Sequence, residues 1–180
     1  KEIINIGIGR SASVLNKVVK NRVLLKVPEV QMIKVTELNS KISFSGDNFL
    51  STVSLDFKGE LLGKVELVFN SPSAIKMVDL LTDKETLVEE MDQLRSATLA
   101  EVGNIVLNSL IGTLGNLLKV RFRYSIPSYK ECSTGDIVQS YNSSAEYLIF
   151  AETLFSVKDI NIEGSFIMFF EVDSLEKFIQ

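Results

Sequence analysis

Histidine is missing from this chain of 180 residues, and cysteine occurs once, at Cys132. Without histidine, a Ser-His-Asp or Cys-His catalytic triad is impossible, and a metal site built from thiolates and imidazoles is excluded. A single cysteine cannot form an internal disulfide, which fits a reducing compartment. Any catalysis therefore has to rely on carboxylates, amides, hydroxyls or a metal ion that a partner supplies.

Long apolar runs and an excess of basic residues are also absent. The longest apolar stretch, around residues 105–118, is interrupted by Asn108, Ser109, Thr113 and Asn116, so it does not predict a membrane helix. The net charge of −4 and the pI near 5.0 argue against bulk nucleic-acid binding. No signal peptide opens the chain. We therefore expect a cytoplasmic protein with no nucleic-acid partner and no membrane insertion.

What the sequence does contain is a repeated pattern. Two residues separate Glu2 from Asn5, and 22 residues separate Asn5 from Pro28. Glu101, Asn104 and Pro127 repeat that spacing. The offsets agree, because 104 − 5 = 99 and 127 − 28 = 99. An acid-amide pair that recurs at a fixed distance from a proline indicates a tandem repeat that has kept a chemical site.

The hydrophobic patterns predict a similar order of elements in each half. They predict helices over residues 1–24, 71–81, 85–118 and 175–179, and strands over 30–35, 49–57, 61–69, 120–127, 137–140, 146–155 and 162–172. Each half reads helix, short strand, hairpin, helix. We therefore expect an α+β fold in which two pseudo-two-fold α-β-β-β-α units share one antiparallel sheet with helices packed on it. This predicts one domain over residues 1–180, made of repeats at about 1–84 and 85–180.

The long helix of the second half carries one narrow polar stripe. Its residues are apolar around nearly the whole circumference, which is typical of a buried helix, while Glu101, Asn104 and Asn108 lie along one line. That line is either a solvated surface, a buried network or the place where another molecule docks, and its recurrence in the first half favours docking. Gly103 and Gly7 lie beside the asparagines and would let another backbone approach closely.

These residues resemble the CheC/CheX/FliY phosphatases of bacterial and archaeal chemotaxis. The family motif is Asp or Ser, three residues, Glu, two residues, Asn, 22 residues and Pro, and both copies described above fit it from the Glu onward. Two copies resemble the CheC type, because CheX carries one. The chain departs from the motif at Ala97, where Asp or Ser is expected.

The resemblance implies hydrolysis of the aspartyl phosphate on a CheY-like response-regulator receiver domain. It implies that Asn5 and Asn104 orient the attacking water and that Glu2 and Glu101 anchor the receiver's lysine. A neutral amide suits this task because it accepts and donates hydrogen bonds without titrating. No cofactor of the chain's own is expected, since Mg²⁺ is expected on the receiver.

Two alternatives stay open. The FliM middle domain has the family's fold without the acid-amide pairs, so the chain could be a noncatalytic chemotaxis or flagellar-switch module; it could also be a scaffold that binds CheD. If both sites act, we expect Asn5 to contribute more than Asn104. Gly7 and Gly9 follow Asn5 and would give a partner access, whereas bulkier residues at 105–107 follow Asn104.

Overall fold

The computed structural model describes residues 2–18, 22–27, 29–42, 49–82, 91–142, 147–157 and 160–170. Its elements are α1 (Glu2–Val18), β1 (Val23–Lys26), β2 (Val30–Lys34), the 3-10 helix η1 (Val35–Glu37), α2 (Leu38–Lys41), β3 (Leu50–Gly59), β4 (Gly63–Asn70), α3 (Ser71–Leu81), α4 (Met91–Leu118), β5 (Phe122–Tyr124), β6 (Ser128–Cys132), α5 (Thr134–Asn142), β7 (Tyr147–Val157) and β8 (Ile160–Phe170). The predicted helix over 175–179, the first residues of the predicted helix over 85–118 and the motif residue Pro28 lie outside the described residues.

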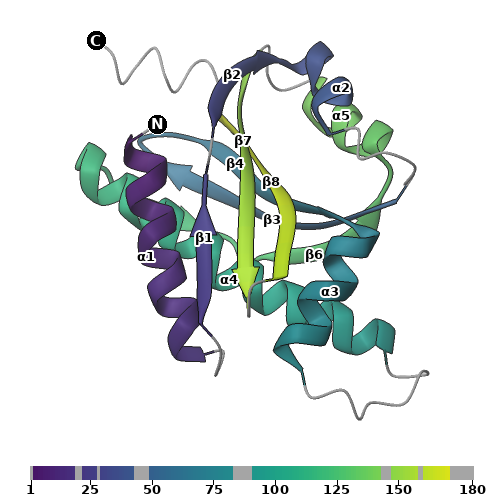
Figure 1. The fold of residues 1–180 in the computed structure, drawn as a ribbon. Coiled ribbons are helices and arrows are strands. Elements are labelled where there is room, and N and C mark those ends of the chain that lie inside the picture. Colours follow the sequence, from purple (N-terminus) through teal and green to yellow (C-terminus); the bar gives the residue numbers. More distant parts are fainter. Residues whose placement is uncertain are drawn as a thin grey trace.

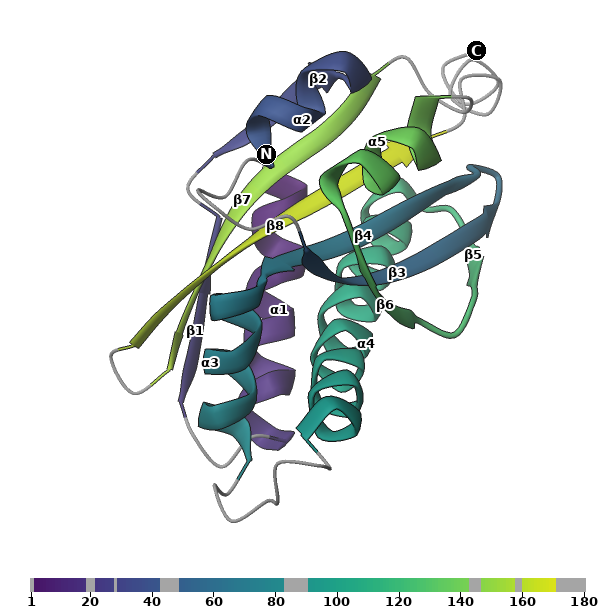
Figure 2. The ribbon, with the colours of Figure 1, turned by 90° about the vertical axis from the view of Figure 1, so that its right-hand side faces the viewer.

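The described strands form one curled antiparallel sheet between two layers of helices. Eight strands pair in the order β1-β7-β8-β4-β3-β5, with β2 also on β7 and β6 also on β3. Helices α1, α3 and α4 lie against one face, and the short helices α2 and α5 lie against the other (Figures 1 and 2). The predicted α+β fold with helices on a shared antiparallel sheet is therefore confirmed.

Each face of the sheet has its own hydrophobic core. In the central strand β4, Val65, Leu67 and Phe69 point into the core under α1, α3 and α4, while Val68 points into the core under α2 and α5. This alternation follows from the two-residue period of a strand. Helix α4 is long and apolar enough to cross a membrane by composition alone, but half of that stretch is buried inside the molecule. Its apolar character therefore reflects its position in the core.

The strand register relates the two halves. In the centre of the sheet, Lys64 pairs with Phe169 and Val68 pairs with Ser165. Lys64 corresponds to Ser165 and Val68 corresponds to Phe169 under one offset, because 165 − 64 = 101 and 169 − 68 = 101. Exchanging the two halves therefore converts the pair Lys64–Phe169 into the pair Val68–Ser165. At the edges, β1 and β2 pair with β7 while β5 and β6 pair with β3. These relations support the proposal of two repeats at about 1–84 and 85–180, which stays a prediction.

The elements before each hairpin differ from the prediction. Two short strands and a short helix precede each hairpin, whereas the pattern predicted one strand over 30–35 in the first half and two strands, over 120–127 and 137–140, in the second. The strand predicted over 137–140 is wrong, because these residues lie in α5. Ser133 and Asp136 form a capping box there: Asp136 N donates to Ser133 Oγ at 3.2 Å and Ser133 N donates to Asp136 Oδ2 at 2.9 Å. Ile137 and Tyr141, one turn apart, are then buried on the same side.

Two predicted boundaries differ. The first helix spans Glu2–Val18, and its predicted extension to residue 24 is wrong at the end, because Val23 and Leu24 lie in β1, where Val23 N donates to Asn16 Oδ1; residues 19–21 lie outside the described residues. The strand predicted over 120–127 is reduced to Phe122–Tyr124, because α4 closes in a turn in which Lys119 has a φ of 59° and Val120 N donates to Gly115 O at 3.0 Å. Helix α3 has its predicted bounds, and Asn70 caps it by accepting from Ser73 N at 2.8 Å.

Candidate functional site

The two helices that carry the acid-amide pairs pack against each other. Gly7 of α1 lies against Leu110 of α4, and Ser11 Oγ donates to Val106 O at 3.2 Å. The helices therefore run in opposite directions where they meet. The two contacts also fit the repeat. Gly7 corresponds to Val106 and Ser11 corresponds to Leu110, because 106 − 7 = 99 and 110 − 11 = 99. The first half and the second half thus supply equivalent helices to one shared face.

Gly7 and Gly103 serve packing inside the molecule. A Cβ atom on Gly7 would lie 3.0 Å from Leu110 Cδ1, and one on Gly103 would lie 2.4 Å from Val53 Cγ1 in β3. A backbone does approach Gly7 closely, as expected, but it is that of α4, with Leu110 Cα 3.2 Å from the would-be Cβ, so Gly7 gives a partner no access. At Gly103 the expectation of a close backbone is wrong, because the neighbour is the Val53 side chain. Gly9 is different, since it is exposed and nothing lies within 4 Å of its would-be Cβ.

The predicted site residues lie along the outer sides of these helices. Asn5 and Glu101 are exposed, and Asn104 is half-buried one turn after Glu101. Glu2 is the first residue of α1, and its side chain lies outside what the structure describes. Because the helices run in opposite directions, Asn5 and Asn104 lie on opposite sides of the contact between Gly7 and Leu110. The fold brings each glutamate near its own asparagine but keeps the two pairs apart.

One contact at the second pair was not predicted from the sequence. Asn108 Nδ2 donates a hydrogen bond to Asn104 Oδ1 at 2.5 Å, and both side chains are half-buried. The two residues stand one helical turn apart, a spacing at which side chains meet. Both residues belong to the polar stripe that the sequence showed on α4, and their spacing of four residues is the feature from which the bond could have been predicted.

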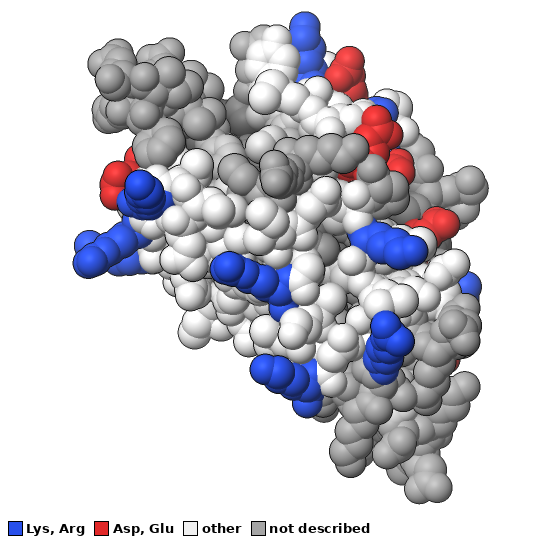
Figure 3. Space-filling view, turned by 60° about the vertical axis from the view of Figure 1, so that its left-hand side comes forward, with Lys and Arg blue, Asp and Glu red and all other residues white. Residues whose placement is uncertain are grey.

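A groove lies between the two helices. Its volume is about 390 Å³, and it is lined by Arg10, Ser13, Val14, Ser109, Gly112, Thr113 and Asn116. In Figure 3, which brings the α1 side of the molecule forward, Lys and Arg side chains are spread over this side and Asp and Glu gather towards its top. On α1 itself, Arg10 and Lys17 are exposed. The α1 side of this surface is therefore basic, while α4 carries the exposed Glu101 one turn before Asn104.

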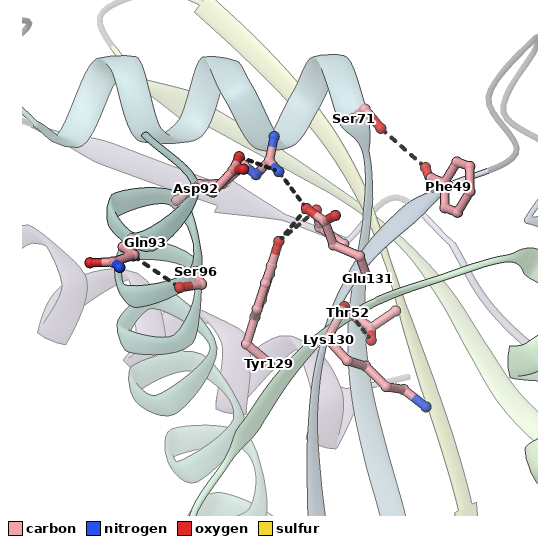
Figure 4. A network of polar contacts seen from close by, with 11 residues as sticks. Phe49, Thr52, Ser71, Asp92, Gln93, Ser96, Tyr129, Lys130 and Glu131 are labelled. Carbon is pink, nitrogen blue, oxygen red and sulfur yellow. Dashed lines mark hydrogen bonds and ion pairs between the residues drawn. The ribbon is translucent and has the colours of Figure 1, made fainter. Parts of the chain in front are cut away.

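A polar network holds the beginning of α4 against the sheet (Figure 4). Arg95 Nη2 lies 3.0 Å from Asp92 Oδ1 and 2.6 Å from Glu131 Oε1 in β6. Tyr129 OH donates to Glu131 Oε1 at 2.9 Å and contacts Ser51 Oγ at 3.3 Å. Burial raises the pKa of Tyr129, so its hydroxyl keeps its proton and acts as a donor. This network fixes α4 about two turns before Glu101.

Metal-ligating groups are sparse in the described part of the chain. No group of three or more His, Cys, Asp or Glu residues comes together there. The asparagines and the glutamates therefore offer hydrogen-bond and charge chemistry instead of a metal centre. The expectation that the chain has no cofactor of its own stays a prediction.

Comparison with known proteins gives a sequence match and several fold matches. No protein-family model matches the chain. The sequence is 26% identical over 132 residues to CheC of Bacillus subtilis (strain 168), which is named a CheY-P phosphatase. The match covers 71% of this chain and 62% of CheC.

Three solved structures show how widely the fold is shared. FliY of Thermotoga maritima matches with a TM-score of 0.75 and 20% identity, over 99% of this chain and 90% of FliY. The FliM middle domain from H. pylori matches at 0.66 and 16% identity, over 99% and 92%. A chain of the CheX-CheY-BeF3-Mg²⁺ complex from Borrelia burgdorferi matches at 0.57 and 19% identity, over 89% and 93%. The sequence match to CheC and the fold shared with FliY and CheX support the predicted resemblance to the CheC/CheX/FliY family of chemotaxis proteins.

Proposed function

We propose that this chain is a protein phosphatase that hydrolyses the aspartyl phosphate of a CheY-like receiver domain. The observation that carries the proposal is the pair of Glu-x-x-Asn motifs on α1 and α4, two helices that pack against each other with Asn5 and Glu101 exposed. Two further findings support it. The sequence match is to a protein named a CheY-P phosphatase, and a chain of similar fold occurs in a complex with CheY.

In the proposed reaction, the asparagines act on water. Asn5 or Asn104 would hold a water molecule in line with the phosphorus of the receiver's phosphoryl group. Positioning of this kind contributes to phosphoryl transfer because the transition state is loose and the protein has little covalent chemistry to supply. The oxygen of a carboxamide can accept a hydrogen bond from this water, and its NH₂ group can donate one to a neighbouring oxygen, without a change in charge.

The glutamates would hold the partner. Glu101, exposed on α4, and Glu2, at the start of α1, would pair with the receiver's lysine by a charge-assisted hydrogen bond. Mg²⁺ would come with the receiver, so the chain would need no metal of its own. The basic surface around Arg10 and Lys17 would favour approach of a phosphorylated partner. A CheY-like partner of this kind also fits a cytoplasmic location.

A second candidate function is a noncatalytic interaction module. The fold match to the FliM middle domain favours it, since that match covers 99% of this chain and a FliM chain of similar fold occurs in a complex with FliG. A scaffold that binds CheD is a further form of this candidate. Both predict that the chain binds a chemotaxis protein without accelerating hydrolysis, so a rate measurement separates them from the phosphatase.

The test is phosphate release from phosphorylated receiver domains with and without the chain. The intact chain is expected to accelerate release, and the double variant Asn5→Ala/Asn104→Ala is expected to lose the acceleration. By analogy with removal of one oxyanion donor, each water-orienting group is worth about 10²–10³ in kcat. Gln139→Ala is the matched control, because it removes an exposed amide from α5 on the opposite face of the sheet. An unchanged rate in the double variant would remove both asparagines from the mechanism.

A further inference from the structure

The amide of Asn104 is already engaged within its own helix. Asn108 Nδ2 donates to Asn104 Oδ1 at 2.5 Å, so one of the two acceptor positions of this oxygen is occupied. Both side chains are half-buried, and Asn108 Oδ1 is buried with no hydrogen-bond partner among the described residues. The Asn104 carbonyl oxygen is therefore held by the side chain of the next turn of α4.

Asn5 has no equivalent neighbour. The position one turn after Asn5 is Gly9, and it corresponds to Asn108 because 108 − 9 = 99. Gly9 has no side chain to donate a hydrogen bond, and the space around it is open for 4 Å. Asn5 is exposed where Asn104 is half-buried. Among the described residues, the two copies of the motif thus differ in burial and in this interaction along their own helices.

We propose that Asn108 restrains Asn104 and makes the α4 site the slower of the two. This inference rests on the proposed phosphatase function and names what regulates one of its sites. To orient an attacking water, the carbonyl oxygen of Asn104 has to accept a hydrogen from that water while the side chain reaches outward to the phosphoryl group. The bond from Asn108 opposes both movements, whereas Asn5 has no such bond to break. Asn108 is therefore a positioning residue that acts through Asn104.

The test exchanges the two positions between the sites, with each site measured alone. In an Asn5→Ala background only the α4 site works, and Asn108→Ala or Asn108→Gly is expected to raise kcat about fivefold, the worth of one ordinary hydrogen bond. In an Asn104→Ala background only the α1 site works, and Gly9→Asn is expected to lower kcat by about the same factor. The open space around Gly9 accommodates the new side chain. KM for the phosphorylated receiver is expected to stay unchanged in all three variants.

The design separates positioning from folding. Asn108→Ala removes the amide while keeping a good helix former, so a rise seen in Asn108→Ala and Asn108→Gly together comes from the lost hydrogen bond. The side-chain NH₂ signals of Asn104 in an ¹⁵N NMR spectrum are expected to shift in Asn108→Ala, and those of the exposed Gln139 to stay in place.

The outcomes are distinct. If the chain accelerates phosphate release but Asn108→Ala leaves the rate of the α4 site unchanged or lowers it, the restraint by Asn108 is refuted and the proposed function stands. A chain that does not accelerate phosphate release at all overturns the proposed function and the inference with it. A fivefold rise at the α4 site together with a fall in Gly9→Asn supports both.

Discussion

Gly103 of α4 lies directly over Val53 of β3, so closely that a Cβ atom on the glycine would be 2.4 Å from Val53 Cγ1. Both residues are buried, and Val53 belongs to the core under α1, α3 and α4. Real Cβ atoms do not come this close to another carbon. The glycine therefore sets the distance between the helix that carries Glu101 and Asn104 and the sheet beneath it.

This contact predicts that Gly103→Ala is destabilising. Overpacking a filled core typically costs about 1–3 kcal/mol, because side chains and backbone have to shift. Urea unfolding measures the loss as a lower midpoint at unchanged slope. Val53→Ala removes the two Cγ atoms, at 2.4 and 2.9 Å, but keeps the Cβ at 2.6 Å, so the double variant Gly103→Ala/Val53→Ala is expected to lose somewhat less stability than the two single changes together. Strict additivity would show that the two residues do not share this contact.

The fold class followed from sequence because long, strongly periodic segments determine it. The hairpin strands of both halves, the helix over 71–81 and the long central helix all lie close to their predicted positions. The elements that the sequence predicted poorly are short. Strands β1, β5 and β6 have three to five residues each, too few for a clear period.

The site shows the same limit. Both acid-amide pairs could be found from the repeated spacing, but two facts about their surroundings depend on tertiary contacts. The role of Gly103 follows from Val53, which is 50 residues away in the sequence. The restraint on Asn104 depends on which rotamer Asn108 adopts. Neither contact follows from periodicity or propensity.

A second prediction concerns a buried ion pair on the other face of the sheet. Glu66 is 1% exposed, and its carboxylate lies 2.5 Å from Lys64 Nζ on the same strand. The fully buried Tyr141 lies close by, and burial together with the charge of Glu66 raises the pKa of its hydroxyl. Lys64→Met would leave the carboxylate buried without a counter-charge, a change that typically costs about 3–5 kcal/mol.

Unfolding by denaturant measures this loss, with Lys58→Met as the matched control. Lys58 is exposed and pairs across the strands with Arg123, so its loss is expected to leave stability unchanged or to raise it slightly. The double variant Lys64→Met/Glu66→Leu replaces the pair by apolar groups and is expected to recover most of the stability. Equal effects of Lys64→Met and Lys58→Met would mean that the ion pair contributes nothing.

A third prediction concerns the single thiol. Cys132 is buried at the end of β6, and burial raises the pKa of its thiol. The reactive form is the thiolate, so Cys132 is expected to react with a disulfide reagent such as DTNB more slowly than free cysteine at pH 8. The raised pKa favours the folded chain below the ordinary thiol pKa, and that contribution is lost as pH rises through the folded value.

The measurement is direct because the chain has one cysteine, which accounts for the whole signal. The native chain is expected to react slowly and the denatured chain at the rate of a free thiol. Reaction of the native chain as fast as free cysteine would contradict the buried position of Cys132 at β6.

The last prediction separates the two residue types of the proposed site. Glu101 is exposed, and in the proposed reaction it pairs with a lysine of the receiver, whereas Asn104 acts on the water. Glu101→Gln keeps the shape and removes the charge. In an Asn5→Ala background, where only the α4 site works, it is therefore expected to raise KM for the phosphorylated receiver, to lower kcat less, and to flatten the dependence of kcat/KM on salt, because screening acts on an exposed ion pair. Asn104→Ala in the same background is expected to lose the acceleration through kcat, as in the double variant above. Glu163→Gln is the control, since this exposed carboxylate on β8 alternates with the core residue Ile162 and so faces away from α1 and α4. A Glu101→Gln variant whose KM and salt dependence match those of Glu163→Gln would show that Glu101 does not anchor the partner.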